Sequence, residues 1–364
     1  MKNEVEKKDN DMCEKELPVD LVFAPIRITT LCRDKHFIRL MESLKKNTWA
    51  KYTDVYVAVD YPLNDQHKPG YNNICKYLKT NSFNEFSSIT IIYRDYNYGA
   101  VKNAYELSNT ILKKHDRIII LEDDLEVSPV FIEYMDKCLH KYQERDDITA
   151  VCAYSYPIDW KVSSHSTVLL HNFTAPTWGI GFWKNKYDLC YRELRKGFLK
   201  KSFVKTKKNG KIKEMINGRR FDYEYFYYTG AHDILFYVVS DMALGIYNNI
   251  KQFKVVSPVV SKVINHGFDG SGVYCSSIRK FKNTHSLNYD YDNQVMDKSM
   301  HFEIVEDKGE FQSKNKQIIN RFLYVTIRQR VSCLLLSILY RIGGIKLSSG
   351  FYDFIKRIRN IIKH

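Results

Sequence analysis

The sequence predicts an α/β protein with a mixed, mainly parallel sheet flanked by helices. Short apolar runs alternate with segments of helical period about every 25–35 residues, which is typical of parallel sheets with crossover helices. Charged residues follow several of these runs directly. No G-x-G-x-x-G follows the first run and no G-x-x-x-x-G-K-S/T occurs, so neither a dinucleotide site of the Rossmann type nor a P-loop is expected.

The first half contains the expected elements in a regular order. Five apolar runs are expected to be strands, at 21–26, 54–60, 88–94, 116–124 and 148–156. Four segments with apolar residues at helical spacing are expected to be helices, at 34–47, 71–81, 101–115 and 128–143. The last helix has Ser128 as its expected N-cap and Pro129 as its first residue.

The second half is less regular. The stretch 173–188 gathers two tryptophans and two glycines, and a basic excursion covers 195–220. A helix is expected from about 231, and the strand-like stretch 254–272 closes on glycines. The expected organisation is a disordered leader at 1–18, one domain at 19–300, and a basic amphipathic helical region at 301–364.

Composition narrows the class of partner and the compartment. The 364-residue chain has a net charge of +14, with Lys and Arg concentrated in 195–220 and 321–364, which favours nucleic acid, an anionic membrane or a phosphorylated substrate. The eight cysteines form no C-x-x-C and no zinc-like spacing, as in proteins of a reducing compartment. The charged N-terminus has no apolar h-region and no stretch reaches the ~18–20 apolar residues of a membrane span, so a cytoplasmic protein is expected.

Three acids end one of the apolar runs. The stretch IIILEDDLEVSP (118–129) places Glu122, Asp123 and Asp124 in a turn directly after a buried strand. Helix capping would account for one acid, whereas a cluster of hard oxygen ligands suits Mg²⁺ or Mn²⁺ with a substrate phosphate. The residues alone leave both interpretations open. Ligands in parallel α/β sheets bind beyond the carboxyl ends of strands, where Arg27, Asp60 and Arg94 are also expected.

Four separated segments resemble, in family order, the GT-A-fold glycosyltransferases, in particular the N-acetylglucosaminyltransferase I group and related bacterial capsule and O-antigen transferases. They are FAPIRITT, IIILEDDLEVSPVFIEYMD, TWGIGFW and HGFDGSGVYC, spanning about 21–280. The resemblance implies a GT-A fold and a metal-dependent, inverting transfer of sugar from a nucleotide-sugar, with UDP-sugars as the expected donors. It also implies that 19–300 is a catalytic domain, with the nucleotide-binding half at about 19–155 and the acceptor half at about 156–300.

The resemblance also implies roles for the residues of the first half. Asp124 is the expected metal ligand, and Glu122 and Asp123 contact the donor and the water shell of the metal. Arg27 occupies the place of the arginine after the first strand that contacts the nucleotide, and Asp60 that of the acid on the base. Arg94 and Lys102 lie near the nucleotide, although Ala100 replaces the leucine usual in this segment.

In the second half the resemblance implies a lid and a base. Gly270 and Ser271 belong to a glycine-rich loop over the donor, although an ordinary tight turn also fits. His266 is a candidate metal ligand, although a lone histidine is more often structural, and Trp178 with Gly179 is a candidate floor under the sugar or part of the core. Asp233 is the expected catalytic base, with Asp222, Glu224 and Asp269 as runners-up and helix capping as the alternative.

The basic tail predicts where such an enzyme works. Residues 320–364 form amphipathic pieces with Lys and Arg interleaved, which suits either an anionic membrane surface or packing on the domain. We favour the membrane's inner face, where a glycan on a polyprenyl diphosphate would be the acceptor for surface polysaccharide synthesis. The competing classes are a nucleic-acid-binding or nucleotidyl-transferring protein and a non-catalytic membrane-associated scaffold. No aromatic RNA-binding motif accompanies the basic residues, so nucleic acid is not expected as a partner.

Overall fold

The computed structural model describes residues 17, 20–157, 159–172, 174–198, 241–271 and 294–307, and single helical positions between 331 and 354. The expected base Asp233, most of the basic stretch 195–220 and most of the leader lie outside these ranges. Within them, none of the helices combines the length and the apolar character that crossing a bilayer requires.

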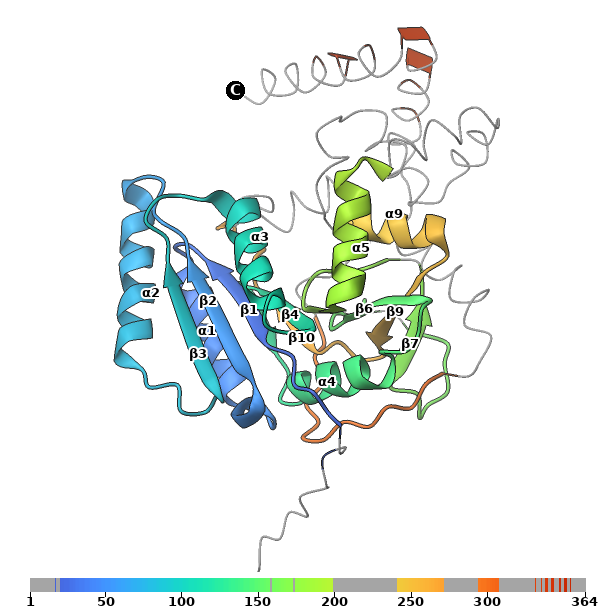
Figure 1. Ribbon diagram of the computed structural model, residues 1–364, viewed down its shortest axis with the longest axis horizontal. Helices are drawn as coiled ribbons and strands as arrows, with labels where there is room; N and C mark the ends of the chain where they lie inside the picture. The colour runs from blue at the N-terminus through green and yellow to red at the C-terminus, as the bar shows by residue number, and fades with distance from the viewer. Residues whose placement is uncertain are drawn as a thin grey trace, which may run out of the picture.

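An eight-stranded sheet forms the centre of the protein, in the order β3-β2-β1-β4-β8-β6-β9-β7 (Figure 1). Its strands are β1 (Ile26–Thr30), β2 (Asp54–Val59), β3 (Ser88–Tyr93), β4 (Arg117–Glu122), β6 (Ile148–Cys152), β7 (Val168–His171), β8 (Ile180–Trp183) and β9 (Lys254–Pro258). All share one direction except β7 and β8, which run antiparallel to their neighbours. The predicted α/β architecture with a mixed, mainly parallel sheet is confirmed.

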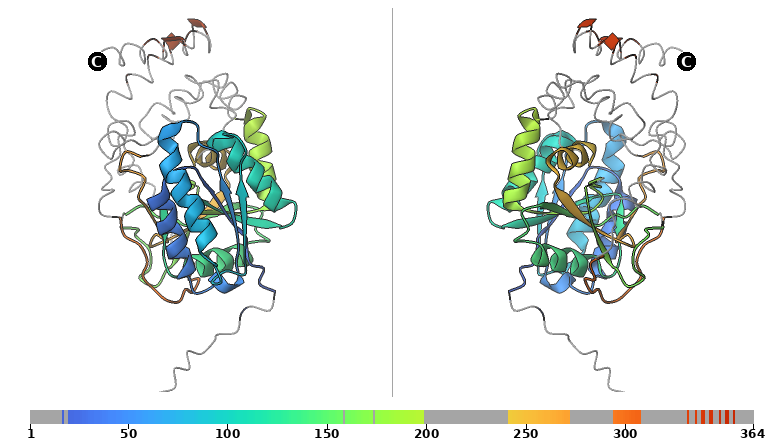
Figure 2. Two further views of the ribbon diagram at one scale, coloured as in Figure 1. Left: turned by 90° about the vertical axis from the view of Figure 1, so that its left-hand side faces the viewer. Right: turned by 90° about the vertical axis from the view of Figure 1, so that its right-hand side faces the viewer.

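Helices cover both faces of the sheet (Figure 2). One layer consists of α1 (Asp34–Lys45), α2 (Lys68–Thr80) and α4 (Phe131–Lys141), and the other of α3 (Gly99–Leu112), α5 (Lys184–Arg195) and α9 (Asp241–Lys251). Short 3-10 turns occupy Ala50–Tyr52 and Asp65–His67. Strand side chains alternate between the layers, so Ile119 and Leu121 of β4 face the first and Ile118 and Ile120 the second.

The first strand does not lie where the apolar run 21–26 predicts. Its ladder to β2 and β4 covers Ile26–Thr30 instead. Pro25 explains the difference, because proline has no N–H to donate and β1 is hydrogen-bonded on both sides. The carboxyl end of this strand therefore lies four residues later than predicted, at Thr30 rather than at Ile26.

The segment after the acids also differs from the prediction. Leu125–Val127 forms a short strand, β5, which pairs with β10 (Val263–Asn265) in an antiparallel ladder. The helix expected at 128–143 begins only at Phe131, and Ser128 makes no capping bond with its side chain. The strand-like stretch 254–272 is divided into β9, β10 and a loop. The β5–β10 ladder brings the two loops of the site together.

Candidate active site

The acids lie at the point where the winding of the sheet reverses. From β1 the chain winds outward through β2 to β3, whereas β4 lies on the other side of β1. The loops that leave the carboxyl ends of β1 and β4 meet at this edge of the sheet, which is where α/β sheets bind ligands. Arg33 follows β1, and Asp123 and Asp124 form the turn after β4.

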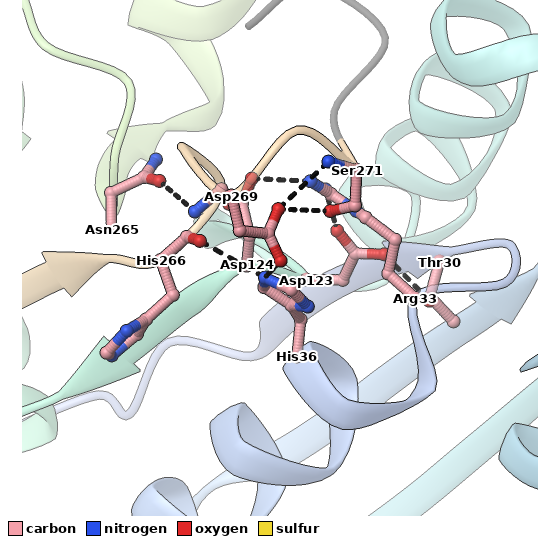
Figure 3. Close-up of polar contacts among 10 residues, drawn as sticks. Thr30, Arg33, His36, Asp123, Asp124, Asn265, His266, Asp269 and Ser271 are labelled. Atoms are coloured by element: carbon pink, nitrogen blue, oxygen red, sulfur yellow. Dashed lines mark hydrogen bonds and ion pairs between the residues drawn. The ribbon is translucent and has the colours of Figure 1, made fainter. Parts of the chain in front are cut away.

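Arg33 pairs with both aspartates (Figure 3). Its Nη1 donates to Asp124 Oδ2 at 2.8 Å, and its Nη2 donates to Asp123 Oδ1. Asp123 Oδ2 also accepts a 2.8 Å hydrogen bond from the Thr30 hydroxyl at the end of β1. We call Arg33, Glu122, Asp123 and Asp124 the edge cluster. It contains one guanidinium and three carboxyl groups, so acid is in excess.

Burial and mutual repulsion change the acidity of this cluster. Burial, followed by the charges of Asp124 and Asp241, raises the pKa of Glu122 to about 8, so this carboxyl is largely protonated at neutral pH. Burial also raises the pKa of Asp123, although Arg33 and Thr30 oppose that shift. The two aspartates in turn raise the pKa of the Arg33 guanidinium. A site that holds a proton on an acid in this way is poised to bind positive charge.

The loop after β10 closes against the edge cluster. The His266 amide donates to the Asp124 carbonyl at 2.8 Å. A Cβ at position 267 would lie 2.2 Å from Asp124 Oδ2, so only glycine leaves room for this carboxylate. His36 on α1 holds the loop from below, with its Nε2 3.1 Å from the His266 carbonyl and 3.3 Å from Asp269 Oδ2 (Figure 3). Neither the contact made by His36 nor the steric need for Gly267 was predicted from the sequence.

The expected donor-loop residues form the far end of this loop. Gly270 has φ +95°, a conformation that favours glycine. The Ser271 amide and hydroxyl donate to Asp269 Oδ1 at 2.9 and 2.7 Å. Both residues are exposed, and Asp269 already accepts from both donors of Ser271.

The ring of His266 points away from the acids (Figure 3). Its Nε2 lies 2.8 Å from Glu126 Oε2 on the neighbouring strand, and this contact is the main cause that lowers the pKa of Glu126. The structure therefore brings the backbone of His266, and not its imidazole, to Asp124.

The Trp178–Gly179 pair lies under the same loop. The Trp178 ring contacts Phe268 and Tyr154 edge-on, with centroids 5.7 and 4.6 Å apart. Gly179 has φ +73°, and a Cβ there would lie 2.8 Å from the Ala153 Cβ. Trp178 is only partly buried and packs against the hydrophobic core as well as the loop, so both the floor position and the core position expected for it stay open.

Asp60, Arg94 and Lys102 meet at the ends of β2 and β3. Asp60 is buried, and its Oδ1 accepts hydrogen bonds from the amides of Tyr61 and Tyr98 at 2.9 and 2.8 Å. The Arg94 guanidinium stacks over the Tyr98 ring at 4.5 Å, and Lys102 Nζ lies 4.2 Å from the same ring centroid. Three residues separated in the sequence thus form one polar and aromatic corner at the same edge of the sheet as the acids.

Arg27 contacts neither Asp123 nor Asp124 among the bonds of the described residues, although its guanidinium lies close enough to Glu122 for the two charges to interact. It lies inside β1, where strand alternation directs it to the layer of α3. Its Nη1 is 3.3 Å from both the Ala104 carbonyl and the Ser108 hydroxyl, and its burial lowers the guanidinium pKa. Because β1 ends at Thr30, the arginine that follows the first strand is Arg33. The position expected for Arg27 is therefore wrong, and Pro25 was the signal that could have corrected it.

A divalent cation fits the edge cluster only together with a substrate. Among the described residues, no group of three or more His, Cys, Asp or Glu side chains could hold a metal ion. Asp124 Oδ1, however, is buried and has no hydrogen-bond partner in the described part of the chain. Mg²⁺ commonly binds one or two carboxylates and completes its shell with water and substrate phosphates. Asp124 and Asp123 meet that requirement.

Asp241 is a further acid near the cluster. It is the first described residue of α9 and lies close enough to Glu122 to raise the pKa of that group. Sequence analysis placed the base at Asp233, in the same region of the chain. Asp241 was overlooked because its proximity to β4 depends on how α9 packs.

Comparisons with solved structures find glycosyltransferase chains at low similarity. No family model and no curated protein sequence matches this chain. Staphylococcus aureus TarS matches with TM-score 0.31 and 13% identity over 45% of this chain. S. aureus TarS 1-349 in complex with UDP-GlcNAc matches with TM-score 0.32 and 12% identity, also over 45%.

The third neighbour is the mannosyltransferase PcManGT from Pyrobaculum calidifontis in complex with GDP-Man and Mn²⁺. It matches with TM-score 0.31 and 12% identity over 46% of this chain. The matched region covers 28%, 46% and 48% of the three neighbours, which is less than half of each. We therefore argue the function from the residues of the site.

Proposed function

We propose that this protein is a glycosyltransferase that moves a sugar from a nucleotide-sugar to a glycan or lipid-linked glycan. The observation that carries the proposal is the edge cluster. It places an excess of buried carboxyl groups and one arginine at the reversal point of the sheet, with Asp124 Oδ1 lacking a partner among the described residues. The four segments that resemble GT-A glycosyltransferases support the same class, and the N-acetylglucosaminyltransferase I group remains the proposed relative.

We propose that two groups of residues bind the donor. The corner of Asp60, Arg94 and Lys102 would take the nucleoside, since Tyr98 offers a ring face and Asp60 offers a carboxylate acceptor for a base N–H. Asp124 and Asp123 would hold Mn²⁺ or Mg²⁺, which when bound neutralises the charge that develops on the leaving diphosphate. Arg33 lies beside them and adds a positive charge that could pair with the diphosphate. Gly270, Ser271 and Trp178 would enclose the sugar.

Transfer also requires a carboxylate that removes the proton of the acceptor hydroxyl. Asp233 is the candidate from the sequence, and Asp241 is the candidate from the structure because it lies near the edge cluster. An inverting reaction needs this base on the face of the sugar opposite the leaving diphosphate. We propose inversion on the basis of the family resemblance.

The biological setting follows from the tail and the charge of the chain. A net charge of +14 and the basic residues of 321–364 support attraction to an anionic membrane, on its inner face. We propose a polyprenyl-diphosphate-linked glycan as the acceptor and surface polysaccharide, such as capsule or O-antigen, as the product. Binding of the full chain and of a chain lacking 320–364 to anionic liposomes would test this setting.

A donor screen followed by base variants tests the function. Nucleotide-sugars with Mn²⁺ are expected to raise the melting temperature, because a ligand stabilises the state that binds it. With the donor found, Asp241→Asn should lower kcat by about 10²–10⁴-fold while leaving donor affinity unchanged. Asp233→Asn is the matched control, and the reverse result would make Asp233 the base. A chain that binds and hydrolyses no nucleotide-sugar would contradict the proposal.

A further inference from the structure

Asp123 and Asp124 of the edge cluster are both paired with Arg33, a side chain of the same protein. Arg33 contacts both aspartates through separate nitrogens, and both carboxylates are more than nine-tenths buried. We infer that Arg33 is an internal counter-ion that competes with the divalent cation, and that the diphosphate of the donor removes this competition. The inference rests on the proposed function and concerns the order in which that site is filled.

The position of Arg33 is determined by packing. Gly70 of α2 packs against Cys32, the residue before Arg33. A Cβ on Gly70 would lie 1.9 Å from the Cys32 carbonyl oxygen. Asn73 on the same helix donates to Asp34 Oδ2 at 2.7 Å, and the Arg33 carbonyl accepts from the Phe37 amide in α1. The backbone of the β1–α1 loop is therefore held from two sides. The Arg33 guanidinium can therefore exchange partners only by a rotation of the Arg33 side chain.

The charges of the cluster make the competition unavoidable. The two aspartate side chains share one guanidinium, so the pair and Arg33 together carry a single net negative charge when both carboxylates are charged. A divalent ion on Asp124 would lie next to Arg33, where like charges repel strongly at low effective dielectric constant. Either the guanidinium leaves Asp124 Oδ2 or it weakens the ion bound through Oδ1. Both arrangements reduce the affinity of the cation.

A diphosphate changes this balance. Its oxygens accept from a guanidinium in the same forked geometry as a carboxylate, and they also complete the shell of Mg²⁺ or Mn²⁺. Bound nucleoside diphosphate would therefore draw Arg33 from the aspartates and attract the cation to them. Cation and nucleotide then bind with positive coupling, and each raises the affinity of the other by the same factor. The free enzyme would not hold a cation firmly before its donor arrives.

Titration of Mn²⁺ monitored by the paramagnetic resonance of the free ion tests the inference. Three proteins are compared, namely the full chain, Arg33→Gln and Arg33→Lys, each with and without UDP or GDP. In the absence of nucleotide, Arg33→Gln should bind Mn²⁺ about tenfold more tightly than wild type, since the nearby positive charge is gone. Arg33→Lys keeps the charge and should stay close to wild type. The increase in Mn²⁺ affinity caused by the nucleotide should be smaller in Arg33→Gln.

Two controls distinguish a failure of the counter-ion inference from a failure of the proposed function. Thermal melting confirms that each variant is folded, and Arg33→Gln/Asp124→Asn should lose the gain in affinity if the ion uses Asp124. If wild type binds Mn²⁺ with nucleotide while Arg33→Gln binds it no more tightly without nucleotide, the counter-ion inference is wrong and the proposed function stands. If none of the proteins binds Mn²⁺ under any condition, the metal assignment of the proposed function fails together with the inference.

Discussion

Two clusters of buried charge in this protein differ in their balance. The edge cluster has three carboxyl groups and one arginine. A second group, the strap cluster, fastens residues 294–307 to the body of the protein. It consists of two acids, two lysines and a histidine: Glu133, Asp297, Lys137, Lys262 and His301. Lys262 pairs with Asp297, and Glu133 accepts from Lys137 at 2.6 Å and contacts His301 Nδ1 at 2.8 Å.

The difference separates a structural cluster from one that requires a ligand. Buried charges are expensive unless each has a partner, and every carboxylate of the strap cluster has one. In the edge cluster, Glu122 keeps a proton near neutral pH and Asp124 Oδ1 lacks a partner among the described residues. A fold retains such an imbalance at a cost in stability. The cost is offset when a positive ion or a diphosphate complex binds there.

The largest expected effect comes from removing one charge of the edge cluster. Asp124→Asn should lower sugar transfer by about 10²–10³-fold, because the charge that would hold the cation beside the leaving group is lost. The melting temperature should not fall, since the change also removes repulsion between neighbouring acids. Steady-state kinetics and thermal melting on one preparation measure both quantities. An Asp124→Asn protein with near wild-type transfer would overturn the role assigned to the edge cluster.

A matched change in the strap cluster should lower the stability of the protein and leave sugar transfer unchanged. Asp297→Asn leaves Lys262 with 4% side-chain exposure and no carboxylate partner at that position, which costs about 3 kcal/mol of unfolding free energy. Transfer by the protein that remains folded should be unchanged. Denaturant unfolding measures the loss, and Asp297→Leu with Lys262→Met should restore part of it because the pair is then apolar. Equal stability of Asp297→Asn and wild type would remove the distinction between the clusters.

The predictability of these two clusters from the sequence differs for a physical reason. Glu122, Asp123 and Asp124 are adjacent in the chain, so local pattern revealed their turn and their place at the sheet edge. Arg33 could be found only by knowing where β1 ends, which depends on Pro25 and on hydrogen bonds to two neighbouring strands. The pair Lys262–Asp297 joins residues far apart in the sequence, and no local period encodes it.

The same reasoning applies to the fold. In the half that contains β1 to β4, strands alternate regularly with helices. All four strands were predicted, although the predicted end of β1 lies four residues before the observed one. In the other half, β8 enters antiparallel between β4 and β6, and β7 pairs antiparallel with β9. Such insertions depend on partners that lie elsewhere in the chain. For this reason TWGIGFW was recognised as a motif while its strand was not.

The smallest expected effect concerns two buried acids, Glu122 and Asp136. Their pKa values are raised to a similar extent, but their surroundings differ. Burial is the main cause for both Glu122 and Asp136, and raises each pKa to about 8. Only Glu122 is raised further by neighbouring acids, whereas Asp136 on α4 accepts a 2.9 Å hydrogen bond from the Ala24 amide. Asp136 therefore serves as a control outside the site.

Each of these carboxyls should make stability fall as pH rises. Between about pH 4.5 and 8 the folded protein holds a proton that the unfolded chain has lost, so unfolding free energy decreases by about 1 kcal/mol per pH unit for each group. The contribution is fully present below the unfolded pKa and is lost as pH rises through 8. Glu122→Gln and Asp136→Asn should each flatten the pH dependence of the unfolding free energy, measured at pH 5.5, 6.5 and 7.5, by a similar amount. Only Glu122→Gln should alter the pH profile of transfer, and an unchanged profile would place Glu122 with the structural acids.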